Sequence, residues 1–222
     1  MDFFRLIQSL DELIFEVVSW LLFYPLTLWR VISRPLATMK CAEQDLADED
    51  RKSFNDVVAP PLFLLITLIL LHGVELATVG ESSLVTSQEG FQGLINNDTN
   101  LVIFRVLGYS LLPLIAARRM VTARGLALGR DSLRPPFYAQ CYVVSVFAII
   151  TGAAGYTIEN RATFDDLAFF PVLVAAFAWL LAIEARWFAT ELKVSIWRGI
   201  GETLLMTGQW LLILLPILIL LS

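Results

Sequence analysis

The chain alternates between long apolar runs and short polar stretches. A transmembrane helix needs about 20 mostly apolar residues to cross about 30 Å of hydrocarbon. Five segments meet this requirement, namely 61–79, 101–117, 137–156, 167–185 and 201–221. The second segment is the shortest and contains Arg105. The pattern predicts an all-α fold, a polytopic integral membrane bundle of five transmembrane helices within residues 61–222.

The N-terminal 34 residues carry a different pattern. Their polar residues recur at steps of three and four, as Asp2, Arg5, Ser9, Glu12, Glu16 and Ser19. This spacing places them along one stripe of a helix whose other face is apolar. Because such a helix lies in the membrane interface, we expect an interfacial amphipathic helix over 1–34. The alternative is a sixth span over 13–32, and the pattern leaves it open.

Basic residues are distributed unequally between the polar stretches. Residues 30–60, 118–136 and 186–200 together contain thirteen Lys and Arg, whereas 80–100 and 157–166 contain only Arg161. Cytoplasmic loops of membrane proteins are enriched in Lys and Arg. We therefore expect a cytoplasmic N-terminus, an acidic cytoplasmic segment over 35–60 and a C-terminus on the outer side.

The composition agrees with a membrane protein and excludes several other classes. Hydrophobic residues make up 57% of the 222 residues and charged residues 17%, and the mean hydropathy is +0.71. The net charge of −5 argues against a nucleic-acid partner, and two cysteines are too few for a disulfide scaffold. The partner that composition predicts is the lipid bilayer.

Sequence motifs for catalysis or metal binding are missing. The single histidine, His72, excludes H-E-x-x-H zinc motifs, and Cys41 and Cys141 lie too far apart in sequence for a C-x-x-C motif. The chain has no P-loop motif and no G-x-S-x-G motif. We therefore expect no catalytic residues, no metal, no cofactor and no enzymatic activity.

Three ionisable residues within the predicted spans form the main candidate site. His72 and Glu75 are three positions apart, so they share one face of the first helix. Glu75 lies about one turn from the outer end of that span, and Arg105 lies about one turn into the next. Antiparallel neighbours would place Glu75 and Arg105 at equal depth. The cluster is either a structural ion pair with His72 hydrogen-bonded nearby or a proton or substrate relay.

A second group of charges is predicted at the cytoplasmic ends of the last two spans. Glu184 and Arg186 end the fourth span, and Arg198 and Glu202 flank the fifth. Long side chains at this depth can reach the membrane surface. We expect a surface ion-pair cluster here.

Two cytoplasmic stretches are candidates for contact with a protein partner. The acidic stretch 40–56 is either a docking segment or a solvated connector to the first span. The arginine-rich stretch 118–136 either contacts anionic headgroups or partners, or serves only as the positive-inside signal.

The layout of five spans after an amphipathic segment resembles the Yip1-domain family. Two segments are similar to the second and third spans of its bacterial members, namely Arg105-Val106-Leu107-Gly108-Tyr109-Ser110-Leu111-Leu112-Pro113 and Phe137-Tyr138-Ala139-Gln140-Cys141-Tyr142. The D-L-Y-G-P-like motif of eukaryotic members is absent, so the resemblance does not imply Rab binding. The resemblance implies the fold more than the activity, because bacterial members are often labelled permease-like without an assigned substrate. We expect a non-enzymatic scaffold or an assembly or trafficking factor of Yip1-like type in a bacterial inner membrane. The alternative is a small permease or permease subunit that uses His72, Glu75 and Arg105.

Overall fold

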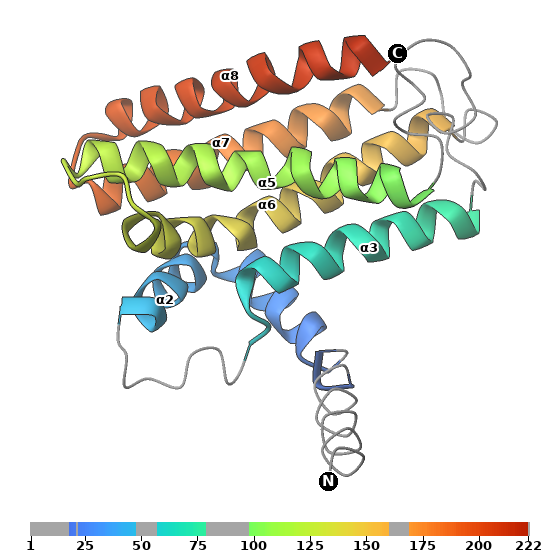
Figure 1. The fold of residues 1–222 in the computed structure, drawn as a ribbon, viewed down its shortest axis with the longest axis horizontal. Coiled ribbons are helices and arrows are strands. Elements are labelled where there is room, and N and C mark those ends of the chain that lie inside the picture. Colours follow the sequence, from blue (N-terminus) through green and yellow to red (C-terminus); the bar gives the residue numbers. More distant parts are fainter. Residues whose placement is uncertain (1–17, 21, 48–56, 79–97, 160–168, 222) are drawn as a thin grey trace, which may run out of the picture.

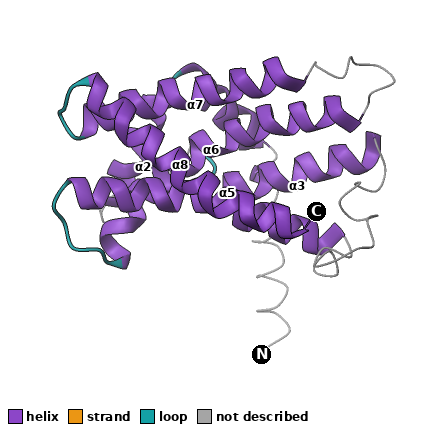
Figure 2. Cartoon of the chain, turned by 90° about the horizontal axis from the view of Figure 1, so that it is seen from above, coloured by secondary structure: helices purple, strands orange, loops and turns teal. Residues whose placement is uncertain are grey.

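The computed structural model describes residues 18–20, 22–47, 57–78, 98–159 and 169–221. Every regular element in these ranges is a helix, as Figure 2 shows. A short N-terminal helix, Val18–Ser33, precedes α2 (Pro35–Ala47), α3 (Pro60–Thr78), α5 (Asp98–Ala123), α6 (Arg130–Glu159), α7 (Phe169–Glu191) and α8 (Ile196–Leu221). The all-α prediction is confirmed.

Five of these helices, α3 and α5 to α8, are long and apolar enough to cross a membrane. Even α3, with 19 residues, is about 28 Å long at 1.5 Å per residue. The five helices run alongside one another in the long direction of the molecule (Figure 1). The protein is a multi-pass membrane protein, and in its described residues two shorter helices precede the five long ones.

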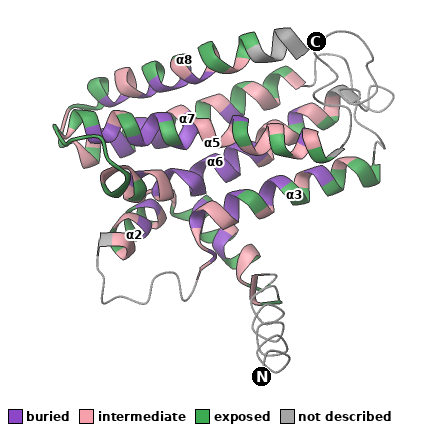
Figure 3. Ribbon diagram, viewed as in Figure 1, coloured by how far each residue is buried: buried purple, intermediate pink, exposed green. Residues whose placement is uncertain are grey.

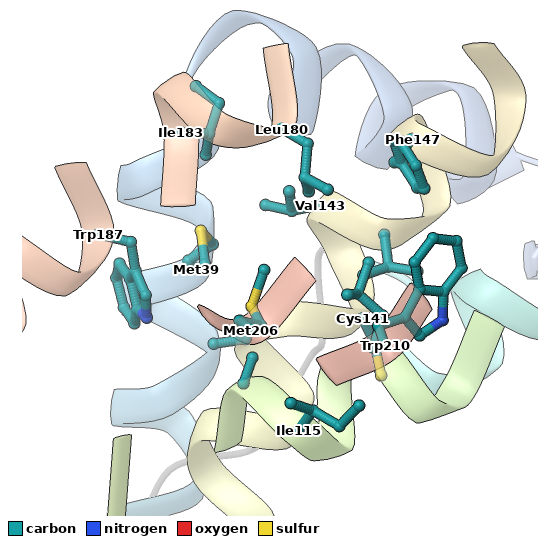
Figure 4. Close-up of a cluster of buried hydrophobic side chains, with 14 of the residues drawn as sticks. Met39, Ile115, Cys141, Val143, Phe147, Leu180, Ile183, Trp187, Met206 and Trp210 are labelled. Atoms are coloured by element: carbon teal, nitrogen blue, oxygen red, sulfur yellow. The ribbon is translucent and has the colours of Figure 1, made fainter. Parts of the chain in front are cut away.

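Helix α6 is the centre of the bundle and contacts α2, α3, α5 and α7. Its residues 139–148 are all buried. Around it, Met39, Phe147, Leu180, Met206 and Trp210 from four helices belong to one buried apolar cluster (Figure 4). The middle of α6 therefore has no face towards solvent or lipid.

Four helices extend beyond the apolar segments from which they were predicted. Helix α5 continues to Ala123 instead of 117, α6 begins at Arg130 instead of 137, α7 ends at Glu191 and α8 begins at Ile196. The stretches 118–136 and 186–200 are therefore mostly helical, and treating them as loops was wrong. Hydropathy marks where lipid contact ends, whereas these helices continue because their charged ends pack against one another.

The two connections at this end, 124–129 and 192–195, begin with the same turn. Gly125 has φ of 69°, and Leu126 N–H donates to the Val121 carbonyl at 3.1 Å. Lys193 has φ of 52°, and Val194 N–H donates to the Ala189 carbonyl at 3.0 Å. These are the hydrogen bonds of a helix C-cap with one left-handed residue. We call this end of the bundle, which contains the basic stretches 118–136 and 186–200, the basic end.

Packing is tighter towards the basic end than towards the opposite end. The buried residues of α7 lie between Ala176 and Phe188, and its first residues, 169–175, are exposed or half-buried. Figure 3 shows the same difference along α5 and α7. The bundle is therefore less closely packed at the opposite end.

The region predicted as an acidic segment contains a packed helix. Met39 and Ala42 of α2 are buried in the apolar clusters of the bundle. The N-terminal helix runs obliquely away from the bundle in Figure 1 and is shorter than the five long helices. Residues 1–17 and 48–56 lie outside the described residues, so the predicted interfacial helix and acidic stretch are described only in part.

Candidate functional site

A cavity of about 570 Å³ lies between α3, α5 and α6, away from the basic end. Its walls are mainly apolar, including Leu68 and Leu71 of α3 and Ala148 of α6. The polar side chains that line it are Glu75, Thr78, Arg105, Tyr109, Thr151 and Tyr156. An apolar cavity of this size with few polar groups is typical of sites for small molecules.

Glu75 and Arg105 form an ion pair across α3 and α5 on the cavity wall. Arg105 Nη2 donates to Glu75 Oε1 at 2.9 Å, and Arg105 Nη1 donates to Glu75 Oε2. The Glu75 side chain is 14% exposed and the Arg105 side chain is 24% exposed. Two parallel hydrogen bonds fix the guanidinium and the carboxylate in one plane. This contact is the ion pair across the first two spans that was one of the two interpretations of the cluster.

His72 lies beside the pair but outside the cavity lining. Its Nδ1 is 3.9 Å from Glu75 Oε2, which is too long for a hydrogen bond. This nitrogen is buried and has no hydrogen-bond partner in the described part of the chain. The predicted hydrogen bond between His72 and the pair is therefore not formed in this structure.

A second polar contact lines the cavity one helical turn further along α5. Tyr109 and Thr151 share a hydrogen bond of 2.7 Å between their hydroxyl groups, which joins α5 to α6. Sequence reasoning missed both residues because hydroxyl groups are common in apolar helices. The available signal was the spacing of Arg105 and Tyr109, which places them on one face of α5.

Two glycines of α6 have different roles beside the cavity. A Cβ at Gly152 would lie 3.3 Å from Leu71 Cδ2, so the glycine allows α3 to approach closely. A Cβ at Gly155 would meet nothing within 4 Å, and this residue lines the cavity. Gly152 therefore allows close helix packing, whereas Gly155 leaves space open.

The ion-pair cluster predicted at the basic end is not formed. Glu184 is fully buried and accepts a hydrogen bond of 2.9 Å from Gln140 Nε2. Arg186 and Arg198 are exposed, and neither forms an ion pair within the described ranges. Residues two apart in a helix point in nearly opposite directions, so Glu184 and Arg186 cannot share a surface. The prediction considered depth and ignored rotation about the helix axis.

The fourth member of that predicted cluster, Glu202, pairs with an arginine of α5. Arg119 donates to Glu202 Oε2 from Nε at 3.0 Å and from Nη2 at 2.5 Å. Nearby, Arg124 pairs with Glu43 of α2 and Glu191 of α7. These contacts join α2, α5, α7 and α8 at the basic end, which explains why the helices continue there.

No group of three or more metal-ligating side chains occurs among the residues that the structure describes. Comparison of the chain with protein-family models, curated proteins and solved structures gives no match. The resemblance to the Yip1-domain family therefore stays a prediction from the sequence.

Proposed function

We propose that this membrane protein binds a small amphipathic molecule in the cavity between α3, α5 and α6 and acts as a permease or permease subunit. The observation that supports this function is the position of the Glu75–Arg105 pair on the wall of the cavity. A charged pair that only joined two helices would not need an open space beside it.

The lining chemistry defines the class of ligand. An anionic group on the ligand can share the Arg105 guanidinium, and a cationic group can share the Glu75 carboxylate. The apolar remainder of the ligand can pack against Leu68 and Leu71, where burial contributes about 25 cal/mol per Å². In the predicted orientation, with the basic end in the cytoplasm, the cavity lies in the outer part of the bundle.

A Yip1-like scaffold without enzymatic activity is the second candidate function. It is favoured by α2, which Glu43 and Arg124 tie to the basic end. Lys40, Cys41 and Gln44 of α2 are exposed. A protein partner at 40–56 and 118–136 would bind at this end and would not need the cavity.

Filling the cavity tests the proposed function. Gly155→Leu should occupy the space without a clash, because a Cβ there meets no atom within 4 Å. Gly201→Leu is the matched control, since Gly201 has equal space on α8 and does not line the cavity. The wild-type protein and each variant are extracted in mild detergent from the membranes of the cells that express them. Native mass spectrometry then measures the mass of each protein with any bound molecule.

We expect wild-type protein and Gly201→Leu to retain a small-molecule adduct that Gly155→Leu loses. Absence of any adduct on the wild type, or equal adducts on all three proteins, would contradict the proposal. A stoichiometric protein partner retained equally by all three would favour the scaffold.

A further inference from the structure

A second hollow lies where the N-terminal helix meets α2. It has a volume of about 230 Å³. Its lining includes Arg30 of the N-terminal helix, Arg34 just after that helix, and Thr38, Cys41 and Asp45 of α2. We call it the junction hollow. It contains two cationic groups and one carboxylate, in contrast to the apolar cavity described above.

Beside the junction hollow, hydrogen bonds join the entry to α3 to the N-terminal helix and to α6. Val58 N–H donates to Thr27 Oγ1 at 3.0 Å, and Tyr142 Oη donates to the Val58 carbonyl at 2.8 Å. Thr27 and Tyr142 are buried. Because α3 begins at Pro60, the hollow lies at the depth where a membrane-spanning helix starts. Phospholipid headgroups occupy this depth.

The helix that leads to the hollow has an apolar face without a partner in the described structure. Its large exposed side chains follow steps of three and four, as Val18, Leu22, Leu26, Trp29 and Ile32. Trp29 is 69% exposed, and tryptophan is enriched at the membrane interface. An acyl chain can lie along this face while its headgroup reaches Arg30 and Arg34.

We infer that the junction hollow binds the headgroup of an aminophospholipid. A phosphoethanolamine headgroup carries one phosphate and one primary ammonium. The phosphate matches the Arg30 and Arg34 guanidinium groups, and the ammonium matches the Asp45 carboxylate. A purely anionic headgroup would bring its negative charge towards Asp45, and a choline headgroup has no N–H to donate. This site is independent of the proposed cavity ligand.

Side-chain substitutions can test the site without disturbing the junction. The backbone of Arg34 is held by N–H donation to the Arg30 carbonyl and by the Thr38 hydroxyl. Both contacts use main-chain atoms of Arg34, so Arg34→Gln keeps them. Arg186→Gln is the matched control, since Arg186 is an exposed arginine that does not line the hollow.

The full-length protein is incubated in detergent with equimolar phosphatidylethanolamine, phosphatidylglycerol and phosphatidylcholine. Bound lipids are counted by native mass spectrometry, and thermal unfolding confirms that each variant is folded. We expect preferential retention of phosphatidylethanolamine by wild type and Arg186→Gln. Loss of one charge-assisted contact should reduce retention about tenfold in Arg34→Gln. Asp45→Asn should lose the preference over phosphatidylcholine.

Equal retention of the three lipids by wild type, or unchanged retention in Arg34→Gln and Asp45→Asn, would overturn the inference. Preference for phosphatidylglycerol would assign a purely anionic headgroup instead and would overturn it as well. Free O-phosphoethanolamine should not displace the lipid at equal concentration, because it lacks the chains that contact the apolar face. Equal binding of the free compound would overturn the lipid assignment.

Discussion

Replacing either Glu75 or Arg105 with glutamine should destabilise the protein by about 3–5 kcal/mol, because the remaining charge loses its partner inside the bundle. Glu75→Gln leaves the Arg105 guanidinium without a carboxylate, and Arg105→Gln leaves the Glu75 carboxylate without a cation. The double variant removes both charges, so it should recover much of the loss. Unfolding free energies measured in detergent give the coupling between the two residues.

Glu43→Gln is the control for this cycle, because Glu43 also pairs with an arginine but lies at the basic end. Its combination with Arg105→Gln should give additive losses. Additive losses for Glu75→Gln with Arg105→Gln would contradict the interaction between Glu75 and Arg105.

The double variant also tests whether the pair has a function. If the double variant is stable but no longer supports the cellular function, the pair acts on a ligand. If the function is kept, the relay hypothesis is wrong.

Gly199→Ala should destabilise the protein by about 3 kcal/mol, at the upper part of the range for overpacking. A Cβ at Gly199 would overlap the carbonyl oxygen of Ala185 and would lie 3.1 Å from Ala189 N. Both atoms belong to the backbone of α7, which cannot move aside as a flexible side chain can. The short 192–195 connection also limits how far α8 can move away from α7.

Gly201→Ala and Gly208→Ala provide controls on the same helix. A Cβ at either position meets no atom within 4 Å. Alanine is a better helix former than glycine by up to about 1 kcal/mol, so these variants should be neutral or slightly more stable. Thermal unfolding of the three variants in one detergent compares them directly. Equal stability of Gly199→Ala and Gly201→Ala would contradict the close approach of α7 and α8.

The features that sequence predicted correctly depend on position along a helix. Five apolar runs of sufficient length predicted the five long helices, and counting residues from the span ends placed Glu75 and Arg105 at equal depth. Neither inference needs the rotation of a helix about its axis. Charge within an apolar run is also a strong signal, because burying it is costly.

The features that sequence reasoning missed depend on rotation and on packing between helices. Glu184 is buried against Gln140, whereas Arg186, two residues later, is exposed. Nothing in the one-dimensional pattern distinguishes these faces, because α7 is apolar on most sides. The cavity depends on how α3, α5 and α6 separate, and the contact of Glu43 with Arg124 depends on where α2 packs.

The permease function proposed for the cavity requires a bundle that crosses the membrane, and the distribution of basic residues predicts that its basic end lies in the cytoplasm. Single cysteines test this requirement directly, once Cys41 is replaced by serine; the remaining Cys141 is fully buried. Leu128→Cys places a thiol at an exposed position in the 124–129 connection. Ser222→Cys introduces one at the C-terminus, which the account expects on the outer side. Intact cells are treated with a membrane-impermeant maleimide. The account predicts labelling at residue 222 alone, with residue 128 labelled only after the membrane is permeabilised. Labelling of both residues in intact cells, or of residue 128 alone, would contradict it.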